Sequence, residues 1–177
     1  MFKLEKNYKI SVLLYMGAGI LPFTIHKGKV LFLFGRENKD KHTGDIAKKG
    51  MWSDFGGSRE DDETYKQTAI REGFEETSGF LGDENIITKL VNEKCVKEIE
   101  HHKYKTFVIY VPYNDTIVKD FRKNFLFVKK NKPELYNQSG LYEKDMIKWV
   151  SYDKLYNFKH EARVFYRGII SKLIRAF

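Results

Sequence analysis

Short runs of apolar residues, separated by stretches rich in glycine and charged residues, predict several β-strands along the chain. Val, Ile, Phe and Tyr are common in these runs, as is typical of strands. The tripeptide His26–Lys27–Gly28 lies between two early runs, and its glycine tolerates the positive φ of a tight hairpin turn. Strands are expected at residues 9–15, 20–25, 29–34, 86–100, 104–113 and 146–150, with a further short apolar stretch at 51–55.

Other segments favour helices, because their residues suit a helix face or a helix end. Asp61 and Asp62 can cap the start of an acidic helix, and Gly79 suits the left-handed residue that ends many helices. The apolar face of the closing helix is predicted to contain Val164, Phe165, Ile169, Leu173 and Ile174. Helices are expected at about 63–77, 116–129 and 160–176, an exposed loop at 36–50 and a second loop at 129–140.

Length and composition favour one globular domain over residues 1–177, with no transmembrane segment. The N-terminal residues lack the pattern of a secretion signal. Cys95 is the one cysteine and cannot form an internal disulfide, so we expect an intracellular protein, cytoplasmic in the simplest case. The net charge of +8 favours anionic partners, either phosphate-rich small molecules or nucleic acid, over a membrane interior.

The stretch from Gly56 to Gly79 places several acids at fixed offsets. Each helical residue turns roughly 100° about the axis, so Glu72, Glu75 and Glu76 fall within one arc of about 100°. Carboxylates three and four residues apart repel one another and destabilise a bare helix. A cation is therefore expected at this face, and a divalent metal with oxygen ligands is the natural candidate.

This stretch resembles the Nudix box, the signature of the Nudix hydrolases. The resemblance extends over most of the chain, from a glycine-rich strand pair to residues 148–155, which are similar to the strand and turn before the family's last helix. The box departs from the family at Gly73, where an aliphatic residue is usual, and at Ser78, where the box glycine usually stands. The resemblance implies an α/β Nudix fold, an α/β/α sandwich with a mixed β-sheet and a box formed by a loop and a helix. The residues that carry it are Gly57, Glu63, Arg71, Glu72, Glu75 and Glu76.

By the family's pattern, Glu72, Glu75 and Glu76 would bind Mg²⁺ or Mn²⁺, with help from the backbone carbonyl of Gly56. The metal would neutralise the diphosphate while water is aligned for attack. Glu63 and Arg71 would pair with each other or with the metal-binding glutamates and so orient these carboxylates.

The general base has two possible locations in the family. It is a box glutamate, here Glu72 or Glu76, or a carboxylate on the loop before the last strand. Glu143 is the best candidate on that loop, followed by Glu134 and Asp145.

The box indicates the reaction and leaves the substrate open. A nucleoside-diphosphate derivative is the first choice, and capped messenger RNA is the second, because positive charge and aromatic residues suit RNA. A diphosphoinositol polyphosphate would require a dense basic pocket. A binding protein without catalysis is disfavoured by the intact glutamates, and no substrate-binding residue is assigned.

Overall fold

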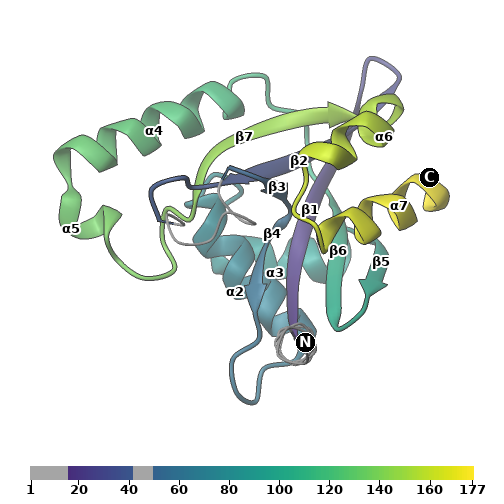
Figure 1. Cartoon of the computed structure of the whole chain (residues 1–177), viewed down its shortest axis with the longest axis horizontal. Helices are drawn as coiled ribbons and strands as arrows, with labels where there is room; N and C mark the ends of the chain where they lie inside the picture. The colour runs from purple at the N-terminus through teal and green to yellow at the C-terminus, as the bar shows by residue number, and fades with distance from the viewer. Residues whose placement is uncertain (1–15, 42–49) are drawn as a thin grey trace, which may run out of the picture.

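The strand β1 (Gly17–His26) is the centre of the sheet because it pairs with three other strands. It runs antiparallel to β2 (Lys29–Glu37) and β4 (Phe55–Ser58), and parallel to β6 (Tyr104–Tyr110). The computed structural model describes residues 16–41 and 50–177, shown in Figure 1. The sheet is mixed, as expected, and is completed by β3 (Trp52–Ser53), β5 (Cys95–His101) and β7 (Lys144–Ser151).

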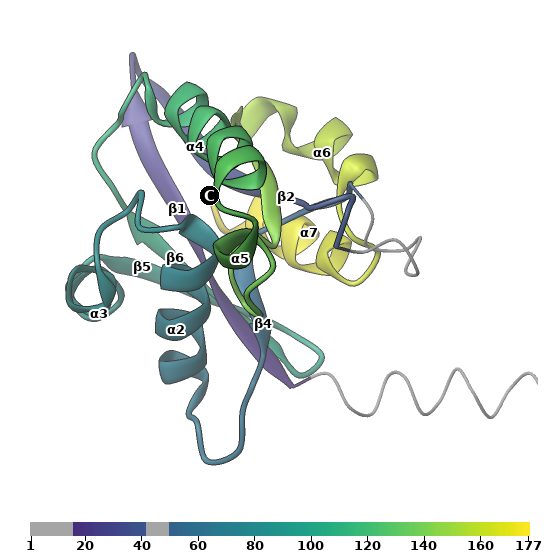
Figure 2. The same ribbon diagram turned by 90° about the vertical axis from the view of Figure 1, so that its left-hand side faces the viewer.

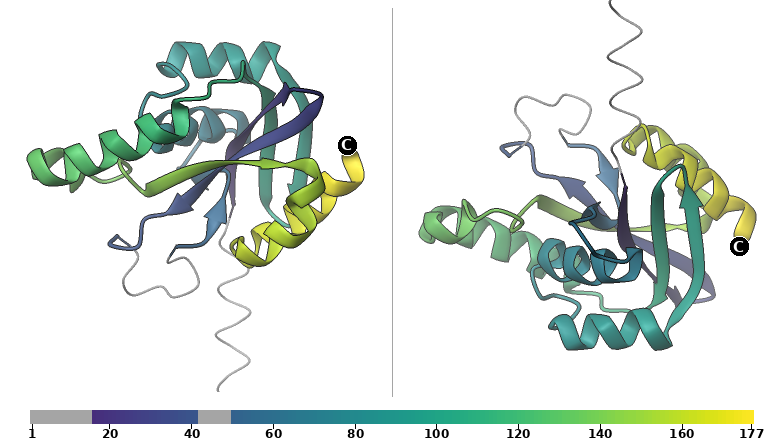
Figure 3. Two further views of the ribbon diagram at one scale, coloured as in Figure 1. Left: turned by 90° about the horizontal axis from the view of Figure 1, so that it is seen from above. Right: turned by 90° about the horizontal axis from the view of Figure 1, so that it is seen from below.

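Alternating side chains divide the core into two layers. Ile20 points to one face of β1, and Leu21 points to the other. Figure 3 shows the sheet between two groups of helices, so the expected α/β/α sandwich is confirmed. The face of Ile20 is covered by α2 (Tyr65–Thr77), α3 (Glu84–Glu93) and α4 (Ile117–Asn131). The opposite face is covered by α6 (Leu155–Phe158) and α7 (Tyr166–Ala176).

The hairpin between β1 and β2 has the predicted tight turn. Lys27 has a φ of 50° and Gly28 a φ of 71°. Two consecutive positive φ values are typical of the turn that matches the twist of a two-residue hairpin. Glycine at the second position adopts this conformation without steric cost.

The acidic helix α2 begins later than Asp61 and Asp62, so the prediction that these residues cap it is wrong. Thr64 is the cap, because its side chain accepts the Gln67 N–H while the Gln67 side chain accepts the Thr64 N–H. At the other end, Ser78 is already left-handed with a φ of 51°, and Gly79 follows with a φ of 75°.

The predicted strand at 86–100 is wrong in its first half, which forms α3. Asp83 caps this helix by accepting the Ile86 N–H at 2.9 Å. Ile87 and Val91, four residues apart, are buried on one face, while Ile86 is exposed. The apolar residues therefore follow helical periodicity, and only the second half forms a strand, β5.

The closing helix is also shorter than predicted. Residues 160–165 contain the end of the 3₁₀ turn Lys159–Glu161, a single β-bridge from Ala162 to Trp52 and a further turn, and the helix α7 begins at Tyr166. Another 3₁₀ turn, Tyr152–Lys154, precedes α6. Val164 is exposed and lies outside the apolar face, whereas Ile169 and Leu173 are buried as expected.

The remaining predictions have mixed outcomes. The helix near 116–129 is confirmed as α4, and part of the expected loop at 129–140 is the short helix α5 (Pro133–Tyr136). Glu37 and Asn38 are buried, so the start of the expected exposed loop at 36–50 is wrong. The predicted strand at 9–15 lies outside the described residues. Within the described ranges, no helix has the length and apolar character to cross a membrane.

The contact between Gly73 of α2 and Ile20 of β1 generates a prediction. A Cβ at Gly73 would lie 2.6 Å from the Ile20 Cδ1 atom. Alanine favours a helix by about 1 kcal/mol over glycine, but overpacking costs about 1–3 kcal/mol. Gly73→Ala is therefore expected to lower the free energy of unfolding by about 1 kcal/mol in urea titrations.

The matched background is Ile20→Val, which removes the Cδ1 atom. In that background, Gly73→Ala is expected to lower the free energy of unfolding by less than half as much, because the closest atom to the new Cβ is gone. Additive effects of the two substitutions would contradict this explanation.

Candidate active site

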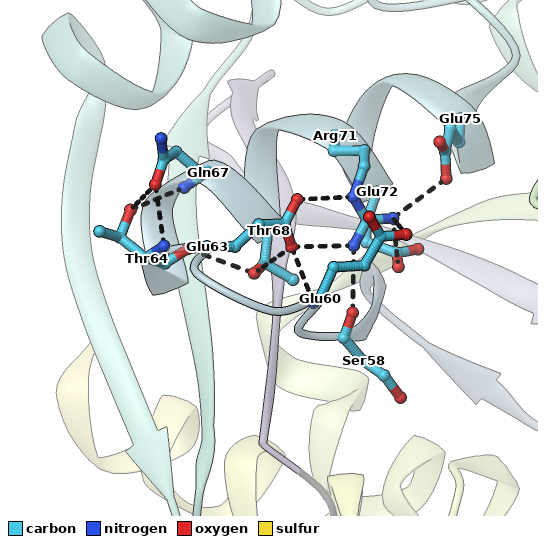
Figure 4. Close-up of polar contacts among 9 residues, drawn as sticks. All are labelled: Ser58, Glu60, Glu63, Thr64, Gln67, Thr68, Arg71, Glu72 and Glu75. Atoms are coloured by element: carbon cyan, nitrogen blue, oxygen red, sulfur yellow. Dashed lines mark hydrogen bonds and ion pairs between the residues drawn. The ribbon is translucent and has the colours of Figure 1, made fainter.

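Arg71 is the cation around which the acids of α2 are arranged (Figure 4). Its Nε lies 2.8 Å from Glu63 Oε1 and its Nη2 lies 3.1 Å from Glu63 Oε2, so the pair is bidentate. Its Nη1 donates to Glu72 Oε1 at 2.9 Å and to Glu75 Oε2 at 3.4 Å. Nη2 also donates to the Ser58 carbonyl. The guanidinium thus links Ser58 and Glu63, before the helix, to Glu72 and Glu75 of α2.

Glu63 is held in place by several donors besides Arg71. The Glu60 N–H and the Thr68 hydroxyl both donate to Glu63 Oε2, at 3.0 and 2.9 Å. Hydrogen bonds from Arg71, followed by these contacts, lower the pKa of Glu63 to about 2. The structure therefore contains the expected pairing of Glu63 with Arg71, while their role in orienting metal ligands stays a prediction.

Glu76 points into the protein, unlike the two glutamates bound to Arg71. It is 2% exposed, and its Oε2 accepts the Gly56 N–H at 2.6 Å. Its Oε1 lies 3.2 Å from the Lys144 ammonium group. Glu76 consequently joins α2 to both β4 and β7 of the sheet.

A cavity of about 320 Å³ lies beside these acids. The segment after α5 supplies Ser139, Gly140 and Glu143 to its lining, and Figure 2 shows this segment passing close to α2. Gly57 forms part of the wall, and a Cβ there would lie 2.5 Å from Glu72 Oε1, so glycine makes room for that carboxylate. The described lining consists of Glu37, Gly56, Gly57, Ser58, Glu60, Arg71, Glu72, Glu75, Glu76, Ser139, Gly140, Glu143 and Arg163.

Three acids of the cavity, Glu72, Glu75 and Glu76, hold protons more tightly than exposed carboxyls do. Burial raises the pKa of Glu72 to about 7, and nearby Glu75 and Glu143 act in the same direction against Arg71. Burial also raises the pKa of Glu75, and it raises the pKa of Glu76 well above the usual value. The protein alone therefore compensates the negative charge of these carboxylates incompletely.

A hard divalent cation fits the chemistry of this donor set. Glu72, Glu75 and Glu76 provide carboxylate oxygens on one cavity wall, which are the ligands that Mg²⁺ and Mn²⁺ prefer. Within residues 16–41 and 50–177, no three His, Cys, Asp or Glu side chains already form a metal-binding group. Glu72 and Glu75 contact Arg71, so a metal would compete with the guanidinium for their oxygens.

The structure brings most of the predicted site residues together. Gly56 and Glu143 line the same cavity as the three box glutamates. Of the other loop acids, Glu134 is exposed on α5, and Asp145 forms a salt bridge of 2.7 Å with Arg36. Neither belongs to the described lining, so Glu143 is the loop carboxylate that the fold brings to the box.

Three charged residues near the box were not predicted from the sequence. Glu37 and Arg163 line the cavity, and Lys144 contacts Glu76. They come from β2, from the turn before α7 and from β7, and no spacing relates them to the box. A weak signal was available for Lys144, because it follows Glu143 directly and lies two residues before the predicted strand at 146–150.

Comparisons with known proteins identify a family and a fold. The chain matches the family model for the NUDIX domain over residues 14–173. A search of curated proteins finds no match.

Solved structures share the fold at low sequence identity. A MutT protein from Methanosarcina mazei Go1 has a TM-score of 0.51 and 19% identity, over 92% of this chain and 95% of that chain. A C. elegans Ap4A hydrolase has a TM-score of 0.51 and 16% identity, over 93% and 98%. A bifunctional NMN adenylyltransferase/ADP ribose pyrophosphatase from Francisella tularensis, complexed with AMP and a Mn ion, has a TM-score of 0.54 and 18% identity, over 97% of this chain and 47% of that chain.

The pairing of Glu63 with Arg71 predicts a pH-dependent contribution to stability. The pKa of Glu63 falls from an ordinary 4.5 to about 2 in the folded protein. Its contribution is therefore fully present above about pH 4.5 and is lost as the pH falls toward 2. Glu63→Gln should lower the free energy of unfolding at pH 7, and this loss should become progressively smaller below pH 4.5. Urea unfolding across this pH range measures the loss. An equal loss at pH 7 and pH 3 would contradict an ionic contribution.

Proposed function

This chain belongs to the Nudix family and is a pyrophosphohydrolase, and we propose that it cleaves the diphosphate linkage of a nucleoside-diphosphate derivative with Mg²⁺ or Mn²⁺. The observation that carries this proposal is the cavity lined by Glu72, Glu75 and Glu76. Burial raises the pKa of each of these carboxyls, so a bound cation would stabilise their ionised forms. A diphosphate is the anionic group that such a cation would in turn attract.

The proposed roles divide between metal ligands and supporting residues. Glu72, Glu75, Glu76 and the Gly56 carbonyl would hold the metal, which supplies charge neutralisation at the diphosphate. Arg71 would orient the ligand carboxylates, since its planar fork contacts Glu63 and Glu72 together. These contacts keep the carboxylates beside the cavity before any substrate enters.

Either a box glutamate, Glu72 or Glu76, or the loop acid Glu143 would accept a proton from the attacking water. The loop acid is favoured because it lines the cavity across from the box helix. Both oxygens of Glu76 already face donors, the Gly56 amide and Lys144, so neither oxygen is free to accept a proton from water without losing a contact.

The charged side chains that line the cavity favour one substrate class over another. Six of its lining residues are glutamates, and none of the described lining residues is a lysine. A diphosphoinositol polyphosphate needs a dense basic pocket, so this lining disfavours it. A nucleoside-diphosphate derivative needs one neutralised diphosphate, which the metal would provide.

Capped RNA is the second candidate, and the surface of α4 favours it. Lys119, Lys123 and Lys130 are exposed on this helix, as is the aromatic ring of Phe127. Lysines beside an exposed aromatic residue suit a single-stranded RNA, which offers phosphates and unstacked bases. The helix α4 leads through α5 to the cavity wall, so an RNA chain could follow it.

The proposal is tested by incubating the protein with a set of candidate substrates and Mg²⁺ or Mn²⁺. The rate at which phosphate-ester products form is measured for each substrate. ADP-ribose and Ap4A represent nucleoside-diphosphate derivatives, and capped RNA and a diphosphoinositol represent the alternatives. Glu76→Gln is expected to lower the rate by at least about 100-fold, because a ligand carboxylate is lost. Glu93→Gln on the exposed end of α3 is the matched control and should retain the wild-type rate. Equal rates in wild type and Glu76→Gln would contradict the proposal.

The general base is tested separately by Glu143→Gln. If Glu143 accepts the proton, its loss should lower kcat by about 10²- to 10⁴-fold, with KM changed less than threefold. Glu134→Gln, a loop acid outside the described lining, should leave kcat unchanged. A rate of Glu143→Gln within a few-fold of wild type would remove this residue from the mechanism and leave a box glutamate as the base.

A further inference from the structure

Lys144 is a fully buried cation on β7, outside the box and outside every role proposed so far. Its ammonium group has three oxygen neighbours, which matches its three hydrogens. Nζ lies 2.5 Å from Glu37 Oε1, 2.9 Å from Ser53 Oγ and 3.2 Å from Glu76 Oε1. A buried ammonium group is costly unless it is paired and hydrogen-bonded, and here each hydrogen has an oxygen within reach.

The side chain of Lys144 has little freedom to move. Lys144 and Glu37 are partners in the antiparallel ladder of β7 and β2, next to an irregularity in the register. The stem passes Gly35, where an added Cβ would lie 3.0 Å from both Cγ and Cδ of Lys144. The close contact with the backbone of β2 therefore fixes the direction in which the ammonium group points.

Glu37 is in turn held from a third element. Arg163 Nη1 lies 3.2 Å from Glu37 Oε1, and both side chains are buried. Two acids, Glu37 and Glu76, and two cations, Lys144 and Arg163, thus form one buried cluster with no formal net charge. The cluster connects the box helix to β2, β7 and the turn before α7.

Glu76 differs from the other box glutamates in the origin of its partners. Glu72 and Glu75 contact Arg71, which belongs to the same helix and can move with it. Glu76 is held at Oε2 by the Gly56 amide and at Oε1 by Lys144, both from the sheet. Its carboxylate is therefore oriented by the rigid part of the protein.

We infer that Lys144 is a positioning residue that fixes the Glu76 carboxylate for metal binding at the cavity. This inference rests on the proposed function, in which Glu76 is a metal ligand. Lys144 itself touches neither metal nor substrate, since it is not among the residues that line the cavity. Groups that orient a metal ligand commonly change metal affinity or activity by about 10- to 100-fold when they are removed.

The direction in which Mn²⁺ affinity changes when Lys144 is replaced distinguishes a positioning role from simple electrostatic repulsion. As a neighbouring cation, Lys144 repels a metal, so removing its charge would tighten Mn²⁺ binding if repulsion were its main effect. If it positions Glu76, removing it weakens Mn²⁺ binding. Lys144→Met, which keeps most of the stem, is the informative variant.

The experiment measures the Mn²⁺ dissociation constant by electron paramagnetic resonance, without substrate. Lys144→Met is expected to raise it about 10- to 100-fold and, in turnover assays, to lower kcat with KM changed less than threefold. Lys148→Met, a lysine-to-methionine change on the same strand at a partly exposed position, should leave both quantities at wild-type values. Mn²⁺ binding in Lys144→Met that equals or exceeds wild type overturns the inference.

A second pair of variants covers the case in which Lys144→Met fails to fold. Glu37→Gln and Glu37→Gln/Lys144→Met are compared, because the double variant keeps the formal charge of the cluster. The double variant should bind Mn²⁺ at least about tenfold more weakly than Glu37→Gln, and equal affinities overturn the inference. Mn²⁺ binding by wild type without hydrolysis of any tested diphosphate would contradict the proposed function and still decide the role of Lys144.

Discussion

The hydrogen bond from the Gly56 amide to Glu76, 2.6 Å long, is the interaction on which the site depends. A carboxylate from the last turn of the acidic helix reaches the sheet, because α2 approaches β1 closely at Gly73, where any side chain would meet Ile20. A buried carboxylate requires partners, since an unpaired polar group in the interior is costly. Gly56 of β4 and Lys144 of β7 provide these partners together. The position of the helix therefore depends on the geometry of the sheet.

The acidic helix is stabilised by cations on two sides. Arg71 binds Glu63, Glu72 and Glu75 on the side of the loop, and Lys144 approaches Glu76 from the sheet. These contacts reduce the repulsion that four closely spaced acids would otherwise cause in the folded chain. The compensation is only partial, and the remaining negative charge faces the cavity, where a metal and a diphosphate would meet.

Site residues that are close together in the sequence could be predicted from it. Site residues that only the tertiary fold brings together could not. Helical periodicity placed Glu72, Glu75 and Glu76 on one face of the helix. The pairing of Glu63 with Arg71 was predicted from the family's pattern, and both residues lie in α2 or the turn before it. Glu143 was found because it precedes a recognisable strand. Lys144 and Arg163 carried no such pattern, since a buried lysine on a strand looks like a surface lysine until its neighbours are known. The segment at 86–93 was misread because Ile86 and Ile87 suit a strand locally, whereas the Asp83 cap and the burial of Val91 require a helix.

The buried contacts around Glu76 join residues at very different distances along the chain. Gly56 and Glu76 are 20 residues apart, whereas the bond between Lys144 and Glu37 spans 107 residues. Contacts between distant residues form late in folding, because the chain must first close a long loop. During synthesis, the acidic helix and its glycine loop can therefore assemble before β7 has left the ribosome, as an incomplete site with unbalanced negative charge. Completion of β7 would then deliver the buried lysine, so the full affinity for metal would develop only in molecules whose folding is finished.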